Sequence, residues 1–221
     1  MVLVNHLLLH RESNQQVNNH LTEMNTKINS LLMHEAKINL SGCWGRCALA
    51  TLIYVVIIGI VSCSYIGELI LFGPMTLGYV IYIVTICRRR KPVTFKTLFD
   101  GFRQFSQALI AGLIYSLAVS IGLFFLIIPG IVVGLGFALT FPIMSDNPGI
   151  SGIDALQQSW VMMRGHKWQL FCLGLRFIGW WVLSVLSLGI GFLWLYPYMT
   201  ASLIGFYNAL KQDYDRCNGI D

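Results

Sequence analysis

The sequence predicts an all-α, polytopic membrane protein with six transmembrane helices arranged as three helical hairpins, together with short interfacial amphipathic helices. The chain has 221 residues, of which 56% are hydrophobic and only 11% charged. An ordinary soluble domain has about 25% charged residues. A soluble core of this size would still need a charged outer surface, so a single membrane domain fits the composition better.

Three long runs with almost no charge lead to the count of six spans. The runs are Cys47–Cys87, in which Glu68 is the one charge, Phe105–Met144, which has none, and Trp168–Leu210, in which Arg176 is the one charge. A helix rises about 1.5 Å per residue and the hydrocarbon core is about 30 Å thick. A run of about 40 residues is therefore long enough for two crossings, and each run is expected to form one hairpin.

Helix breakers indicate the turns within these runs. The expected turns are Ser62–Gly67, Pro129-Gly130 and Ser187–Gly191. Proline is tolerated at the start of a helix, which suits Pro129. Pro74 is expected in the first turns of the second span and Pro197 inside the last span.

The basic residues predict the orientation in the membrane. Fourteen of the fifteen Lys and Arg residues lie in the N-terminal segment before Cys47, in Arg88–Arg103, in Ser145–Lys167 or after Leu210. Six spans place these four segments on one side, which the positive-inside rule makes cytoplasmic. We therefore expect cytoplasmic N- and C-termini. The cluster of topology anchors consists of Arg88, Arg89, Arg90 and Lys91.

The chain divides into a polar N-terminal tail over residues 1–38, a membrane domain over 39–210 and a short cytoplasmic tail over 211–221. Within Asn25–Leu40 the apolar residues recur at helical spacing, which favours an amphipathic helix on the membrane surface. The polar stretch before it has the composition of a loose tail.

The first cytoplasmic loop has the pattern of an interfacial helix that leads into the third span. Four apolar residues recur at i, i+3, i+4 and i+7, namely Phe95, Leu98, Phe99 and Phe102. Thr94 is expected to cap its start.

The second cytoplasmic segment, Ser145–Lys167, is expected to contain a helix as well. Ser151 is suited to the N-cap, with Asp154 three residues later. One face of the helix is expected to carry Ile153, Leu156, Trp160 and Met163. Gly165 and the following His166-Lys167 pair are expected to end it before the fifth span.

Eight short motifs occur in order along the chain: GPMTLGY (Gly73–Tyr79), LFDGF (Leu98–Phe102), IIPGI (Ile127–Ile131), DNPGIS (Asp146–Ser151), DALQQSWVMMRGHKWQLFCL (Asp154–Leu173), FIGWW (Phe177–Trp181), GIGFLWLYPY (Gly189–Tyr198) and GFYNAL (Gly205–Leu210). The ordered set resembles the bacterial integral membrane family called domain of unknown function 975, over about Asn39 to Leu210. The resemblance implies a polytopic helical protein of the bacterial plasma membrane and brings no activity, substrate or catalytic residue. Members of that family usually have a small polar residue where this chain has Arg176.

The sequence contains none of the simpler catalytic patterns. It has no HExxH pair, no P-loop and no G-x-S-x-G elbow. No acidic residue lies deep in a predicted span, which argues against carboxylate-pair catalysis and a proton relay. We expect no enzyme activity and no cofactor or metal. The net charge of +5 is attributed to the basic segments on the cytoplasmic side of the membrane and is not taken to indicate binding of nucleic acid.

Arg176 is the one basic residue inside a predicted span. A charge near the middle of a bilayer costs about 2.5–3.5 kcal/mol, so its side chain should face the bundle or water. It either contacts an anion or substrate in a central pathway, or bonds to backbone carbonyls and snorkels toward the cytoplasm. A transporter should carry more polar residues along its pathway, and the spans offer few others: Ser116, Ser120, Thr140 and Thr200.

Two interpretations of the Asp146-Asn147-Pro148 turn remain open. The residues form a capped tight turn, or they form a cytoplasmic interaction surface with Arg164, His166 and Lys167. The leading functional hypothesis is a non-enzymatic accessory, assembly or envelope-homeostasis module. The alternative is a small-solute transporter or channel with Arg176 in its pathway. The expected partners are the lipid bilayer and either a second copy of the chain or another membrane protein.

Overall fold

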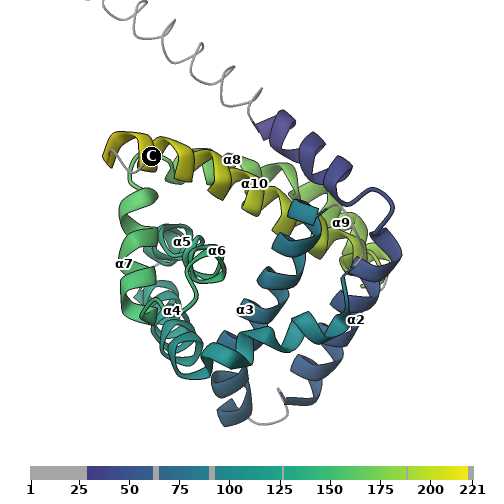
Figure 1. Ribbon diagram of the computed structural model, residues 1–221, viewed down its shortest axis with the longest axis horizontal. Coiled ribbons are helices and arrows are strands. Elements are labelled where there is room, and N and C mark those ends of the chain that lie inside the picture. The colour runs from purple at the N-terminus through teal and green to yellow at the C-terminus, as the bar shows by residue number, and fades with distance from the viewer. Residues whose placement is uncertain (1–28, 62–64, 90–92, 126, 188, 219–221) are drawn as a thin grey trace, which may run out of the picture.

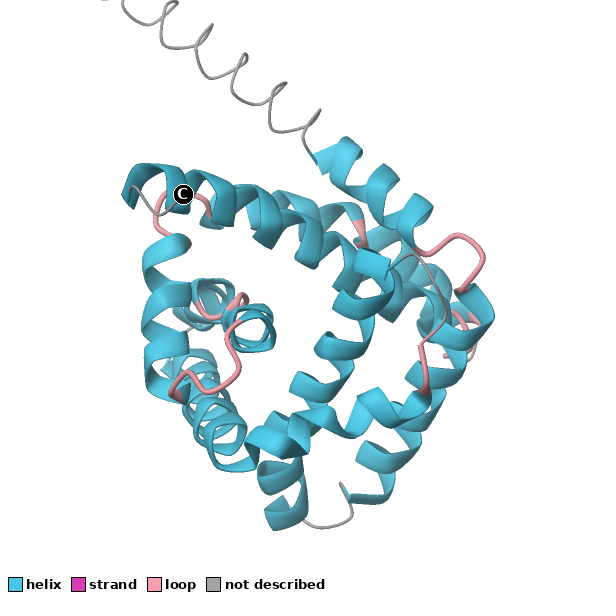
Figure 2. Ribbon diagram, viewed as in Figure 1, coloured by secondary structure: helices cyan, strands magenta, loops and turns pink. Residues whose placement is uncertain are grey.

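The computed structural model describes residues 29–61, 65–89, 93–125, 127–187 and 189–218, and within them every regular element is a helix (Figures 1 and 2). A first helix covers residues 29–39. The others are α2 (Trp44–Val61), α3 (Tyr65–Arg89), the 3₁₀ helix η1 (Phe95–Gln104), α4 (Phe105–Phe125), α5 (Ile127–Gly136), α6 (Thr140–Asp146), α7 (Gly152–Met162), α8 (Lys167–Arg176), α9 (Ile178–Leu186) and α10 (Phe192–Asn218). The all-α class is thus confirmed for the described residues.

Five helical segments in the described part of the chain are long and apolar enough to cross a membrane. They are Trp44–Val61, Leu69–Arg88, Phe95–Phe124, Ile128–Asp146 and Lys167–Leu186. The predicted sixth span corresponds to α10, which is not among them. Tyrosines, Pro197 and Asn208 in its sequence FLWLYPYMTASLIGFYNAL make α10 less apolar than the others. The structure therefore supports a membrane protein, and the sixth span stays a prediction.

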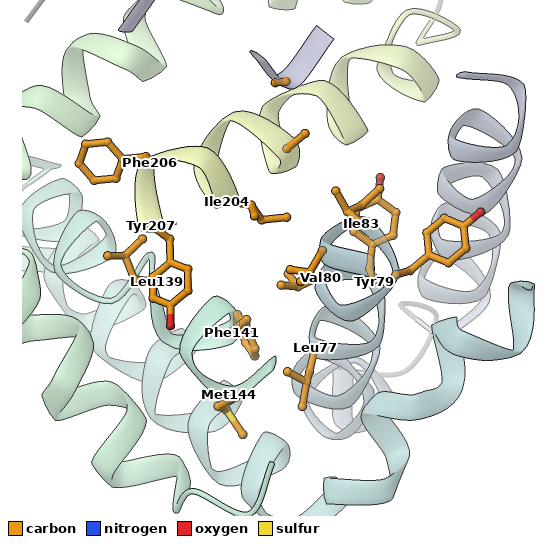
Figure 3. Close-up of a cluster of buried hydrophobic side chains, with 14 of the residues drawn as sticks. Leu77, Tyr79, Val80, Ile83, Leu139, Phe141, Met144, Ile204, Phe206 and Tyr207 are labelled. Atoms are coloured by element: carbon orange, nitrogen blue, oxygen red, sulfur yellow. The ribbon is translucent and has the colours of Figure 1, made fainter. Parts of the chain in front are cut away.

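Helix α3 is the central element of the bundle. Of its span, 61% is buried inside the protein, compared with 17–44% for the other four candidates. It packs against α2, η1, α4, α6 and α10. Figure 3 shows Leu77 and Val80 of α3 opposite Phe141 of α6 and Ile204 of α10, around the middle of the apolar core.

The three predicted hairpins do not run parallel. In Figure 1, α2 and α3 run down the picture side by side, whereas α10 runs across the top of both. The sequence predicts that Trp44 and the Ser187–Gly191 turn lie at opposite ends of the spans. In the structure Trp44, Ser187 and Gly191 line the same cavity. The last hairpin is therefore inclined to the first one.

Close approach of backbones explains how these helices pack. A Cβ atom on Gly73 would lie 2.0 Å from the carbonyl oxygen of Ala108 in α4, and one on Gly78 would lie 1.9 Å from the carbonyl oxygen of Leu98 in η1. Gly122 of α4 and Gly130 of α5 meet in the same manner. Lipid tails are as apolar as the helices, so helices in a membrane associate largely through such van der Waals packing at small residues.

Several predicted boundaries are confirmed. Ser151 is the N-cap of α7, and its Oγ accepts a hydrogen bond from the backbone N–H of Asp154 at 3.2 Å. Pro129 lies in the first turn of α5, and the last turn falls between Leu186 and Phe192. The predicted bend at Ser62–Gly67 lies partly outside the described residues.

The fourth span is not the single helix that the sequence predicts. It breaks at residues 137–139, between α5 and α6. Pro142 explains the break, because its ring lacks an N–H and clashes with the carbonyl group four residues earlier, that of Ala138. The fifth span is interrupted in the same region of the bundle, where Phe177 separates α8 from α9.

Ile153, Leu156 and Trp160 line one cavity, as expected for one face of α7. Two smaller predictions were wrong. Thr94 is the N-cap of η1, but its side chain makes no capping hydrogen bond. Pro74 lies in the third turn of α3 rather than in the first turns, because the helix begins at Tyr65.

Helix packing at Gly78 can be tested by adding one methyl group. Gly78→Ala is expected to destabilise the protein by about 1–3 kcal/mol, the usual cost of overpacking, because backbone of η1 blocks the new Cβ. Gly179→Ala in α9 is the matched control, since nothing lies within 4 Å of its Cβ position. Thermal unfolding in detergent measures both variants, and an equal midpoint for the two would contradict the packing.

Candidate functional site

The strongest polar feature of the structure is the carboxylate of Asp146, whose side chain is only 4% exposed. Its Oδ1 accepts a hydrogen bond from the Arg88 guanidinium at 2.5 Å. Its Oδ2 accepts one from the Lys211 ammonium at 2.8 Å and one from the Tyr207 hydroxyl at 3.2 Å. We call these four residues the Asp146 cluster.

The cluster joins the ends of three helices that are far apart in the sequence. Asp146 is the last residue of α6, Arg88 lies at the end of α3, and Tyr207 and Lys211 lie in the second half of α10. A buried charge is stable only when it is paired and hydrogen-bonded. Two cations and one hydroxyl meet this requirement, so Asp146 stabilises the common end of α3, α6 and α10.

Asp146 mainly links helices within the protein. Its carboxylate is occupied by residues of the chain itself, so it offers little to a partner. Asn147 is exposed, and its Nδ2 donates a hydrogen bond to the Ile143 carbonyl oxygen at 3.3 Å. Asn147 is thus the C-cap of α6, as the capped turn predicts, whereas the side chain of Asp146 bonds to other helices.

The other three residues of the predicted surface follow α7. Arg164 is exposed, and His166 and Lys167 are half-buried. The Lys167 ammonium lies 3.5 Å from the centre of the Trp160 ring, a cation–π contact. The structure therefore divides the predicted surface in two, with Asp146 and Asn147 at the end of α6 and the three basic residues after α7.

Helix α7 is fixed by polar groups that the sequence analysis did not single out. Ser159 is fully buried, accepts a hydrogen bond from the Leu139 N–H at 3.2 Å and donates one to the Gly136 carbonyl at 2.8 Å. It thereby satisfies backbone groups that the break between α5 and α6 leaves free. At the other end of α7, side-chain oxygens of Gln104 and Gln107 accept hydrogen bonds from backbone N–H groups, those of Gly149 and Gly152.

The outer side of α7 remains uncovered. Ile153 and Val161 are 49% and 46% exposed. Together with Gln157 and Arg164 they line a cavity of 460 Å³ that also reaches Ile114 of α4 and Phe137. We call Ile153, Gln157, Val161 and Arg164 the α7 face. It carries apolar side chains on both sides of Gln157 and is basic at one end.

Arg176 is half-buried at the last residue of α8. Within the described part of the chain its guanidinium makes no ion pair or hydrogen bond, and it lines none of the cavities described here. Of the other polar residues expected along a pathway, three donate to carbonyl groups in or beside their own helices: Ser116, Thr140 and Thr200. The transport hypothesis therefore stays a prediction.

An internal cavity of 370 Å³ lies between α3, the α5–α6 segment, α8–α9 and α10. Its lining is mostly apolar and includes Val80, Phe141 and Leu203. Its polar members are Thr76, Tyr196 and Thr200, the last of which the sequence predicts along a pathway. The ring of Tyr196 packs against the rings of Tyr54 and Tyr79 at centre-to-centre distances of 5.7 and 4.9 Å. These aromatic rings form the interface of α2, α3 and α10.

Of the predicted topology anchors, Arg88 belongs to the Asp146 cluster. The side chain of Arg89 and the whole of Arg90 and Lys91 lie outside the described residues. Among the residues that are described, no group of three or more His, Cys, Asp or Glu side chains is arranged to hold a metal ion.

Sequence reasoning missed Tyr207, Lys211 and Ser159. A signal for Lys211 was present, since Asp146 ends an apolar run and a carboxylate there requires nearby cations. Nothing in the sequence indicated that α10, rather than the basic loop after Arg88, would supply one of them. Ser159 looked like an ordinary polar residue on an amphipathic helix.

Together, the five apolar helical segments, two of which end in the ion-pair cluster, define a helical membrane protein. Residues 121–214 match the family model described as Protein of unknown function (DUF975), which confirms the resemblance over that part of the chain. The motifs at Gly73–Tyr79 and Leu98–Phe102 lie before the matched residues. The chain matches no curated protein and no solved structure.

The Asp146 cluster predicts a measurable loss of stability when its acidic member is neutralised. Asp146→Asn leaves Arg88 and Lys211 without a counter-charge, and both are partly solvated, so the expected loss is about 1–3 kcal/mol. Asp154→Asn is the control, because Asp154 is exposed and makes no ion pair with a described residue. Thermal unfolding in detergent compares the two. If Asp146→Asn unfolds at the temperature of the control, the cluster does not hold the helices together.

Proposed function

We propose that the chain is a non-enzymatic module of the bacterial plasma membrane, an accessory, assembly or envelope-homeostasis factor that acts through a partner bound at the α7 face. The Asp146 cluster is the observation that carries this proposal. Its one buried carboxylate is fully engaged by Arg88, Tyr207 and Lys211 and so serves structure rather than chemistry. The same segment of chain then leads into α7, whose outer side is uncovered.

The proposal includes six membrane segments with both termini on the cytoplasmic side. The ion pair between Lys211 and Asp146 supports it, because it returns the end of α10 to the end of α6. Helices α8 and α9 lead away from Lys167, so α10 has to be the returning arm of this last hairpin. Arg88 in the same cluster adds the end of α3 to that side.

Cysteine labelling in intact cells tests this topology. Both Asn147 and Ile128 are exposed in the structure. A membrane-impermeant maleimide is expected to modify Ile128→Cys, at the start of α5, from outside and to leave Asn147→Cys unmodified until the cells are opened. The parent chain, in which Cys43 and Cys47 are buried, provides the blank. An unmodified Ile128→Cys in intact cells would contradict the proposed orientation while leaving the shared side of Asp146 and Lys211 in place.

The chemistry of the α7 face suggests what binds there. Ile153 and Val161 present apolar side chains on both sides of Gln157, and Arg164 adds a positive charge at the end of the face. A groove of this kind suits an amphipathic helix with one acidic residue, since apolar anchors supply affinity and the charge supplies orientation. We therefore expect the partner to be a membrane protein, either a different chain or a second copy of this one.

Site-specific photocrosslinking tests this assignment. A photoreactive amino acid at Gln157, in the centre of the α7 face, is expected to give one discrete protein adduct in cells. The same amino acid at Gln212, which is exposed on α10, is the positional control and should give none. Arg164→Glu should reduce the Gln157 adduct about tenfold, the effect of losing about 1.4 kcal/mol of charge complementarity.

The mass of the crosslinked adduct distinguishes a second copy of this chain from a different protein. Twice the mass of the chain identifies a homo-oligomer, and another mass identifies a different protein. Adducts with lipid alone, or equal adducts at Gln157 and Gln212, would show that the α7 face is an ordinary lipid-facing surface and would overturn the proposal.

A further inference from the structure

A cavity of 470 Å³ lies apart from the α7 face and from the Asp146 cluster. It is bounded by the helix over residues 29–39, by the start of α2 and by the hairpin of α9 and α10. Three tryptophans line it, Trp44, Trp180 and Trp194, and one cation, Lys37. Its size falls within the range of about 300–1,000 Å³ that is usual for small-molecule sites.

The walls of this cavity are apolar, but their edges are not. Leu183 and Leu195 contribute aliphatic surface. Trp180 and Trp194 are 54% and 47% exposed, and none of the three indole N–H groups has a hydrogen-bond partner among the described residues. A tryptophan with an apolar body and a free N–H is typical of the level of lipid headgroups, where one side is apolar and the other is wet.

Lys37 is the charged residue in the lining of this cavity. Its side chain is exposed and forms no ion pair within the described part of the chain. Glu35 is the nearest acidic residue in the sequence, but residues two apart on a helix point to different sides. The lining of the cavity therefore carries one positive charge, that of Lys37, together with three indole groups.

We propose that this cavity binds one anionic glycerophospholipid of the surrounding membrane. The phosphate accepts hydrogen bonds at Lys37 and from the indole groups, and one acyl chain lies between Trp180 and Leu195. Two features support this occupant over others. The single positive charge matches a single phosphate, and the apolar walls next to it match an acyl chain rather than a free anion.

The test uses the full chain reconstituted into phosphatidylcholine vesicles. Lipids with a dibrominated acyl chain quench tryptophan fluorescence on contact, and they are added either as phosphatidylglycerol or as phosphatidylcholine. The phosphatidylglycerol probe is expected to reach half of its quenching at about a fivefold lower mole fraction than the phosphatidylcholine probe. A basic residue near an anionic membrane surface accounts for a factor of this size.

Two variants of one residue and one matched control make the result specific. Lys37→Gln should abolish the fivefold preference, and Lys37→Arg should keep it because the charge is retained. Lys96→Gln removes an exposed charge from η1, which contributes no residue to the cavity lining, and should leave the preference unchanged. Equal quenching by both probes in the parent chain, or an unchanged preference in Lys37→Gln, would overturn the proposal.

Discussion

The placement of one buried carboxylate governs the arrangement of these helices. Asp146 is 4% exposed, and an unpaired charge at such a position would cost several kcal/mol. Its counter-charges come from residues 58 and 65 positions away in the sequence, Arg88 and Lys211. Pairing therefore cannot be achieved locally. It requires α3, α6 and α10 to end at the same place, and this requirement returns the last hairpin to the end where α3 finishes.

Glycine residues allow the close helix packing that ion pairs at the helix ends do not provide. Charge pairing fixes which helix ends meet, but it does not hold apolar helices together along their length. Gly73 and Gly78 let α3 approach the backbones of α4 and η1, and dispersion forces act strongly only at such short range. The central burial of α3 follows from these two constraints together, since its end pairs with Asp146 and its middle admits close neighbours.

The sequence predicts the parts of this structure that depend on local pattern. The all-α class, the Ser151 cap and the turn before Phe192 depend on residue spacing or on backbone preference within a few residues, and they are confirmed for the described residues. The six spans predicted from the apolar runs stay a prediction. The partners of Asp146 depend on contacts across about 60 residues, which periodicity does not reveal. The break at 137–139 also escaped prediction. Pro142 indicated a weak point, but only the contact with Ser159 of α7 makes the open backbone stable there.

Several polar side chains inside the bundle are hydrogen-bonded to each other, which matters for the transport hypothesis. Thr51 and Tyr79 hydrogen-bond to each other at 2.9 Å, as do Tyr54 and Thr76 at 3.3 Å. A polar solute crosses a bundle only where side chains can replace its water, and these hydroxyl groups are already paired. The central cavity is lined mostly by apolar side chains, and the hydroxyl of Thr76 in that lining is one of the paired groups. The described interior thus resembles a packed helical scaffold, and the two recognition sites that we propose lie on its surface, at α7 and at Lys37.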